Sequence, residues 1–150
     1  VMGICNGFQI LLEAGLIPGA MMHNNKLRFV CKSVNIRVEN TESMFTSHLK
    51  KGQVLNIPVS HGEGNYFIDD DGLKALNDNN QVLFRYTDAE GNLTDEANFN
   101  GSRDSIAGIT NVGGNVLGMM PHPERAMEKI LGSEDGKPIF DSILNSLSIA

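Results

Sequence analysis

Cys5 lies between two glycines, in the order Gly3-Ile4-Cys5-Asn6-Gly7, near the start of this 150-residue chain. Apolar residues precede the cysteine, and residues 8–14 have the apolar spacing of a helix that Gly15 is suited to end. A strand, then a nucleophile flanked by glycines, then a helix is the order typical of a nucleophile elbow. In such an elbow a sharp turn holds the nucleophile in a strained conformation. The positive end of the helix dipole favours a thiolate. We therefore expect Cys5 to be a reactive nucleophile with a lowered pKa.

A histidine with a carboxylate two residues later stands far downstream, as His122 and Glu124 in the stretch Pro121-His122-Pro123-Glu124. Pro123 biases His122 towards an extended conformation, in which residues i and i+2 point to the same side. A carboxylate beside an imidazole fixes its tautomer and stabilises the imidazolium, which a base for a thiol nucleophile requires. Each motif alone has a plainer interpretation, a buried cysteine or a solvated turn. Their occurrence together favours a catalytic site of Cys5, His122 and Glu124.

A third segment that could take part in chemistry follows the expected strand at 54–59, in the order Ser60-His61-Gly62. Glycines directly after a strand let the backbone approach a ligand closely. His61 is the alternative base, since Glu63 follows it at i+2. We prefer His122, because prolines hold its surroundings extended, whereas glycines around His61 leave the local geometry open.

Strands and helices that position these residues are indicated by apolar periodicity. Residues 69–72 lack the ligand spacing of a calcium loop and are expected to form a solvated turn, and residues 88–102 a long polar loop or hairpin. The pattern predicts an α/β domain with a mixed sheet and an active site at the carboxyl ends of strands. The expected strands are 1–4, 27–31, 33–39, 54–59, 82–86, 106–110 and 116–120, and the expected helices are 8–14, 73–77 and 138–147.

Composition excludes several classes of function. The net charge is −6 with no basic block, and no apolar run approaches the roughly 20 residues of a membrane span, so neither nucleic acid nor a membrane is an expected partner. The only cysteines, Cys5 and Cys31, indicate neither a disulfide framework nor a metal site, and Cys31 is expected to pack as a small core or interface residue. No Walker or kinase-type glycine loop is present, so no ATP site is expected.

Four stretches, residues 3–11, 27–31, 61–64 and 121–126, resemble the class I (triad) glutamine amidotransferases. The first and last carry the motifs of that class. Together with the middle two they resemble the glutaminase subunits of phosphoribosylformylglycinamidine synthase, which act in purine biosynthesis. The resemblance covers almost the whole chain.

The resemblance implies a flavodoxin-like three-layer sandwich and a Cys-His-Glu triad. Members of the class carry further strands and a glycine-rich loop before the elbow, so residues 1–150 are expected to be the C-terminal portion of a glutaminase domain, with its N-terminal part missing. Backbone N–H groups would stabilise the oxyanion and neighbouring groups would hold glutamine. The residues implied in these binding roles are Asn6, Gly7, Gln9, Ser60, His61 and Gly62.

Function follows from the same resemblance. Glutamine would be hydrolysed, and the ammonia delivered to an ATP-dependent synthetase formed by a large subunit and a small accessory subunit, with residues 24–28 and Arg125 near the interface. ATP and magnesium are expected on that partner and no cofactor on this chain, and a reducing cytoplasm suits the thiolate. The alternatives are the glutaminase of another ammonia-channelling synthetase, a cysteine peptidase or related hydrolase on the same fold, and a non-catalytic binding module.

Overall fold

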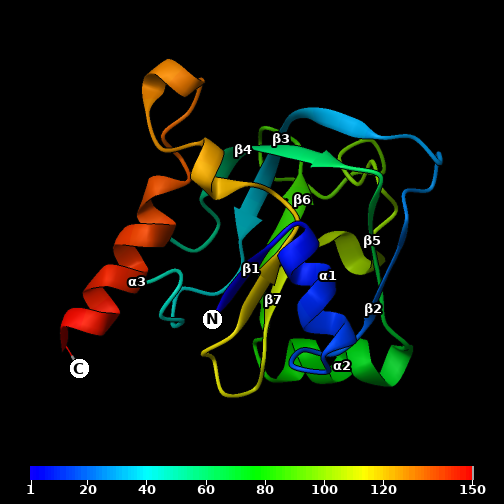
Figure 1. Cartoon of the computed structure of the whole chain (residues 1–150), viewed down its shortest axis with the longest axis horizontal. Coiled ribbons are helices and arrows are strands. Elements are labelled where there is room, and N and C mark those ends of the chain that lie inside the picture. Colours follow the sequence, from blue (N-terminus) through cyan, green and yellow to red (C-terminus); the bar gives the residue numbers. More distant parts are fainter. Residues whose placement is uncertain (150) are drawn as a thin grey trace.

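The structure, a computed structural model, describes residues 1–149 and contains both strands and helices (Figure 1). The strands are β1 (Met2–Ile4), β2 (Ala20–His23), β3 (Val30–Val38), β4 (Val54–His61), β5 (Glu63–Phe67), β6 (Val82–Thr87), β7 (Ile106–Thr110) and β8 (Leu117–Met119). The helices are α1 (Asn6–Glu13), α2 (Asp70–Asp78) and α3 (Lys137–Ile149), with short 3-10 turns η1 (Arg103–Ser105), η2 (Pro123–Arg125) and η3 (Lys129–Leu131).

A six-stranded mixed sheet in the order β1-β8-β7-β6-β3-β4 forms the centre of the described chain. β1 and β8 are parallel, with Ile4 opposite Met119, and the other neighbours are antiparallel. The sheet curls, because the chain that leaves β8 returns to β4, where the backbone N–H of His122 donates to the carbonyl of Pro58 at 2.8 Å. This curl brings the carboxyl ends of β1, β8 and β4 together.

Helices cover both faces of the sheet, which makes three layers (Figure 1). Ile139 of α3 belongs to one buried cluster, together with apolar side chains of β3, β4 and β6. Phe8 of α1 and Leu76 of α2 belong to the second cluster. The period-2 alternation of strands separates the two clusters, since Met119 packs in the first and Met120 in the second. The expected α/β class with a mixed sheet between helices is confirmed.

The turn predicted at residues 69–72 is instead the start of α2. A carboxylate oxygen of Asp69 accepts the backbone N–H of Gly72 at 2.8 Å, which caps the helix, and Asp70 and Asp71 lie in the first turn. Carboxylates are favoured there by the helix dipole, so the acidic run stabilises a helix N-terminus. The helix is therefore longer than the predicted 73–77.

The two strands predicted at 27–31 and 33–39 are also wrong in their bounds. One continuous strand, β3, runs from Val30 to Val38, because nothing interrupts its pairing with β4. The preceding residues turn instead, with Leu27 in the left-handed region at φ 50° and its N–H donating to Asn24. Cys31 is exposed on β3, so it does not pack in the core, and of the two expected roles only that of an interface residue stays a prediction.

A second, two-stranded sheet of β2 and β5 is an element that the apolar pattern did not indicate. The residues of β2 are mostly exposed. In β5 buried and more exposed residues alternate, and Gly64 and Tyr66 are the buried ones. The sheet lies beside α1 (Figure 1) and carries Glu63 towards that helix. The corner after β4 thus continues as paired strand rather than as loop.

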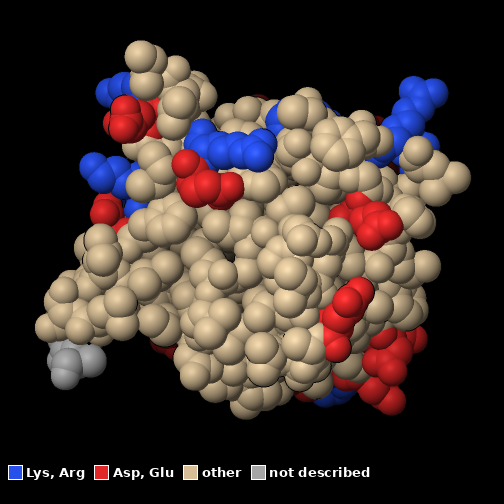
Figure 2. Space-filling view, viewed as in Figure 1, with Lys and Arg blue, Asp and Glu red and all other residues tan. Residues whose placement is uncertain are grey.

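Charged side chains of both signs lie on the surface. In Figure 2, basic residues lie along the upper part of the molecule, and acidic residues lie beside them at the upper left and also along the right side. This face carries no continuous basic surface. Within residues 1–149, none of the helices is both long enough and apolar enough to cross a membrane.

Candidate active site

Cys5 occupies a strained turn between β1 and α1. Its backbone lies at φ 53° and ψ −108°, and its N–H donates to the carbonyl of Met119 on β8 at 2.8 Å. Positive φ is costly for a residue with a side chain, so this conformation has the strain typical of a nucleophile elbow. Gly3 is required sterically, because a Cβ there would lie 2.6 Å from the carbonyl oxygen of Gly7. A Cβ on Gly7 would meet no atom within 4 Å, so the expected steric need for a glycine applies to Gly3 and not to Gly7.

The sulfur of Cys5 lies half-buried at the end of β4. Its Sγ donates to the carbonyl of Ser60 at 3.6 Å. Burial raises the pKa of the thiol above its ordinary value, against smaller lowering effects from the Asn6 backbone N–H and the Arg125 guanidinium. The expectation of a lowered pKa is therefore wrong for the resting site, since desolvation outweighs the helix N-terminus. The sulfur rests as a thiol and needs a base to become nucleophilic.

Alkylation of Cys5 by iodoacetamide is accordingly expected to be slow at neutral pH in the absence of substrate. Its rate should rise with a midpoint above the pH of about 8.5 at which a free cysteine titrates. The measurement needs a Cys31→Ser background, because Cys31 is exposed and would react first. A midpoint near or below neutrality would contradict the dominance of burial.

His122 supplies a base at the end of the neighbouring strand. Its imidazole is largely buried, and Nδ1 lies 2.6 Å from Oε1 of Glu124. Glu124 reaches His122 because the chain turns at the 3-10 turn η2, which begins at Pro123. The expected extended chain from His122 to Glu124 is not found. With the Nδ1 proton directed at the carboxylate, Nε2 is left as the proton acceptor.

Cys5 and His122 both follow the carboxyl ends of parallel neighbours, β1 and β8, where Ile4 pairs with Met119. Among the described residues, the sulfur is hydrogen-bonded to Ser60 and not to His122. Catalytic hydrogen bonds are commonly loose before substrate binds and tighten afterwards. The arrangement provides a thiol, a base and an orienting carboxylate at one end of the sheet.

His61, the alternative base, has a different environment. It is buried at 3% exposure, and its Nδ1 lies 3.2 Å from Oδ1 of Asn24. Burial, with a smaller contribution from nearby His122, lowers the pKa of His61 to about 4. An amide partner does not stabilise imidazolium as a carboxylate does, so the geometry favours His122 as the base.

Asn24 is a site residue that the sequence analysis placed only near an interface. Its amide Nδ2 donates to the carbonyls of Arg28 at 2.9 Å and of His61 at 3.0 Å, which ties the 24–29 turn to the end of β4. Phe99 stacks on the His61 ring with centroids 5.8 Å apart. Both residues lie in irregular polar segments, where periodicity carries no signal.

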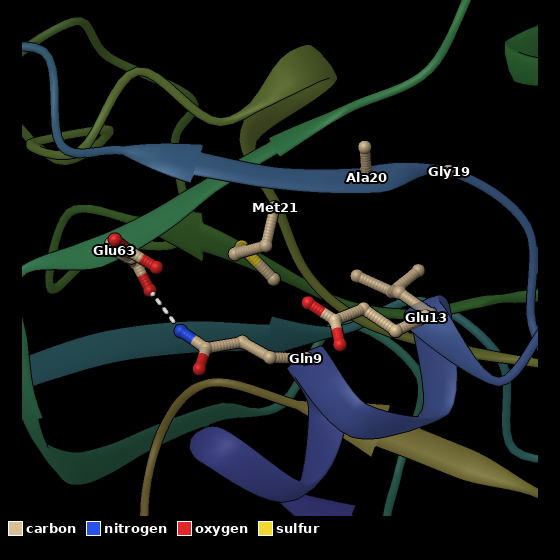
Figure 3. A pocket seen from close by; sticks show the side chains of 7 residues that line it. Gln9, Glu13, Gly19, Ala20, Met21 and Glu63 are labelled. Carbon is tan, nitrogen blue, oxygen red and sulfur yellow. Dashed lines mark hydrogen bonds between the residues drawn. The ribbon is translucent and has the colours of Figure 1, made fainter.

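Gln9 lines a pocket of about 260 Å³ between α1 and the β2–β5 sheet. Its Nε2 donates to the backbone carbonyl of Glu63 at 2.9 Å. Figure 3 shows the carboxylates of Glu13 and Glu63 on either side of this amide, with Met21 facing it from β2. The pocket therefore lies one helical turn from Cys5 and is lined by acidic groups.

No group of three or more His, Cys, Asp and Glu side chains that could hold a metal ion is found within residues 1–149.

Comparison with known proteins places the chain in one family. The family of CobB/CobQ-like glutamine amidotransferase domains matches residues 1–137. The phosphoribosylformylglycinamidine synthase subunit PurQ of Salinibacter ruber is 58% identical over 149 residues, which are 99% of this chain and 63% of that protein. The subunit of the same name from Chlorobaculum parvum is 55% identical over 148 residues, 99% of this chain and 59% of that protein.

A solved structure shares the fold. A chain in the structure of PurLQS from Thermotoga maritima superposes with a TM-score of 0.82 at 47% identity, over 97% of this chain and 61% of that chain. The present chain spans about three fifths of the length of the curated relatives that it matches.

Proposed function

Because this chain belongs to the family of CobB/CobQ-like glutamine amidotransferase domains, we propose that it hydrolyses glutamine to glutamate and ammonia. The observation that carries the proposal is the placement of Cys5 and the His122–Glu124 pair at the ends of adjacent parallel strands. A thiol, a base and an orienting carboxylate are the groups that acyl transfer from an amide requires.

The mechanism begins with proton transfer from the Cys5 thiol to Nε2 of His122, helped by Glu124. The sulfur attacks the carboxamide carbon, and the oxyanion is met by backbone N–H groups of Asn6 and Gly7, which the first turn of α1 leaves without intrahelical partners. His122 then protonates the departing ammonia and activates the water that cleaves the γ-glutamyl thioester.

Glutamine itself would be held by groups that converge from two sheets. We assign Gln9 and the corner of Ser60, His61 and Gly62 to the substrate site, because Ser60 contacts the sulfur and Gln9 faces the adjoining pocket. The acidic lining of that pocket by Glu13 and Glu63 suits the positively charged α-amino group of an amino acid.

We propose that the ammonia serves an ATP-dependent synthetase that makes phosphoribosylformylglycinamidine, the compound after which the relatives are named. A large synthetase subunit with ATP and magnesium, and a small accessory subunit, would be the partners. Phe29, which lies beside Gly62 and is 68% exposed, and Leu27, which is 80% exposed, support docking near residues 24–28. We assign Arg125 to the same interface. We propose a cytoplasmic location, where thiols stay reduced.

The test uses 6-diazo-5-oxo-norleucine, a reactive glutamine analogue, with the full chain and its partner subunits present. We expect covalent labelling of Cys5 that glutamine blocks, together with release of ammonia and glutamate. Peptide cleavage without glutamine protection would indicate a peptidase instead, and absence of labelling would contradict the amidotransferase.

A further inference from the structure

Two imidazole nitrogens in the candidate site are buried without a hydrogen-bond partner among the described residues. They are Nε2 of His61 and Nε2 of His122. A buried polar atom without a partner costs free energy and is rare in folded proteins, so each one needs an explanation.

Both nitrogens are hydrogen-bond acceptors, because a second residue fixes each tautomer. The Nδ1 proton of His122 is directed at Glu124. The amide nitrogen of Asn24 already donates to two carbonyls, so its Oδ1 is the atom that faces His61 and must accept the Nδ1 proton of that ring. Each Nε2 therefore presents a lone pair.

The His61 ring is also fixed in position. Phe99 stacks on it at an interplanar angle of 30°. On another side the β5 backbone lies so close that a Cβ on Gly64 would be 2.1 Å from the ring carbon Cε1. Burial keeps the ring neutral, with its pKa lowered to about 4. A ring held this firmly, with one acceptor unpaired, has the preorganisation of a binding group.

His61 and His122 both lie around the end of β4, the strand whose Ser60 carbonyl contacts the sulfur. Ser60, whose carbonyl accepts the Cys5 thiol at 3.6 Å, directly precedes His61. The backbone N–H of His122 donates to the carbonyl of Pro58 on the same strand at 2.8 Å. In the proposed reaction Nε2 of His122 takes the thiol proton, so Nε2 of His61 is the acceptor left for a hydrogen of the substrate nitrogen.

We propose that His61 is a second acceptor for the carboxamide nitrogen of glutamine and makes the site prefer an amide over an ester. This inference rests on the proposed glutaminase function. Attack by sulfur forms the C–S bond, moves the carbonyl electron pair to oxygen and transfers the thiol proton to His122. In the resulting intermediate, the substrate nitrogen donates one hydrogen to Nε2 of His61. This hydrogen bond orients the lone pair of the substrate nitrogen towards the proton on His122. The nitrogen takes the proton from His122, the C–N bond breaks, and ammonia leaves as the carbonyl re-forms in the thioester.

The experiment compares glutamine with glutamate γ-methyl ester, whose leaving oxygen has no hydrogen to donate. It uses the full chain with its partner subunits and two variants, His61→Asn and His61→Gln. The side chain in His61→Asn places its amide where Nδ1 was and has no atom at the Nε2 position. The side chain in His61→Gln is longer and reaches the Nε2 position. Both variants lose the stacking on Phe99 equally, and His48→Asn serves as an exposed control.

For His61→Asn we expect kcat on glutamine to fall about 10-fold, and kcat on the ester to stay within about 2-fold of the unsubstituted protein. His61→Gln should recover part of the glutamine rate. Equal losses on both substrates, equal losses in both variants, or no loss in His61→Asn would overturn the assignment while leaving the glutaminase proposal intact. Absence of any activity on glutamine in the unsubstituted protein would overturn both.

Discussion

Cys5→Ala is expected to abolish glutamine-dependent synthesis by the complete complex while ammonia-dependent synthesis continues. The sulfur is the only nucleophile that the described site offers beside His122, and loss of a catalytic nucleophile typically lowers kcat by roughly 10⁴-fold or more. Ammonia supplied in solution bypasses the thioester, so the synthetase reaction does not need the thiol. The measurement is product formation with each nitrogen donor at saturating concentration.

Alanine at this position leaves the elbow backbone otherwise unchanged, since the N–H of residue 5 still donates to Met119. Cys31→Ser is the matched control, because Cys31 is the other cysteine and is exposed near the start of β3. Equal loss of both activities in Cys5→Ala would contradict the division of labour between glutaminase and synthetase.

Gly136→Ala is expected to reduce glutamine hydrolysis strongly, although residue 136 lies outside the site. Gly136 is buried against η2, and a Cβ there would lie 2.1 Å from the carbonyl oxygen of Pro123. Backbone atoms cannot yield as a flexible side chain does, so the turn that holds His122 and Glu124 must shift. A displacement of about 1 Å in a catalytic group costs roughly 10²-fold in rate.

The same overpacking should lower Tm by roughly 2–10 °C, as expected for a strain of about 1–3 kcal/mol in a domain of this size. Gly113→Ala is the matched control, since its added Cβ would be at least 3.4 Å from any neighbour in an exposed turn. Calorimetry and glutaminase assays on both variants check the prediction. Unchanged hydrolysis in a folded Gly136→Ala protein would show that η2 tolerates the shift.

Local motifs made the elbow and the His122–Glu124 pair predictable. A nucleophile elbow is specified within seven residues. His122 and Glu124 are only two positions apart in the sequence, so they lie close together whatever the rest of the chain does. Buried strands such as β6 and the β7–β8 hairpin were likewise indicated by continuous apolar runs and a glycine-containing turn. These features depend on interactions close in sequence, which a pattern records directly.

Other features depend on tertiary contacts and were missed or wrong. The pKa of Cys5 follows from burial by elements far along the chain, which outweighs the local helix terminus. The partnership of Asn24 with His61 joins a turn to a distant strand end through side-chain hydrogen bonds. Leu27 adopts a left-handed conformation that its residue type disfavours, so its segment was predicted to be strand.

The pairing of Ile4 with Met119 has a consequence for synthesis of the protein. At roughly 5–20 residues per second, His122 leaves the ribosome on the order of ten seconds after Cys5. Until then the emerging chain carries a thiol with no base to deprotonate it. If the proposed glutaminase mechanism holds, a nascent or prematurely terminated polypeptide that ends before β8 therefore consumes no glutamine and releases no free ammonia into the cell.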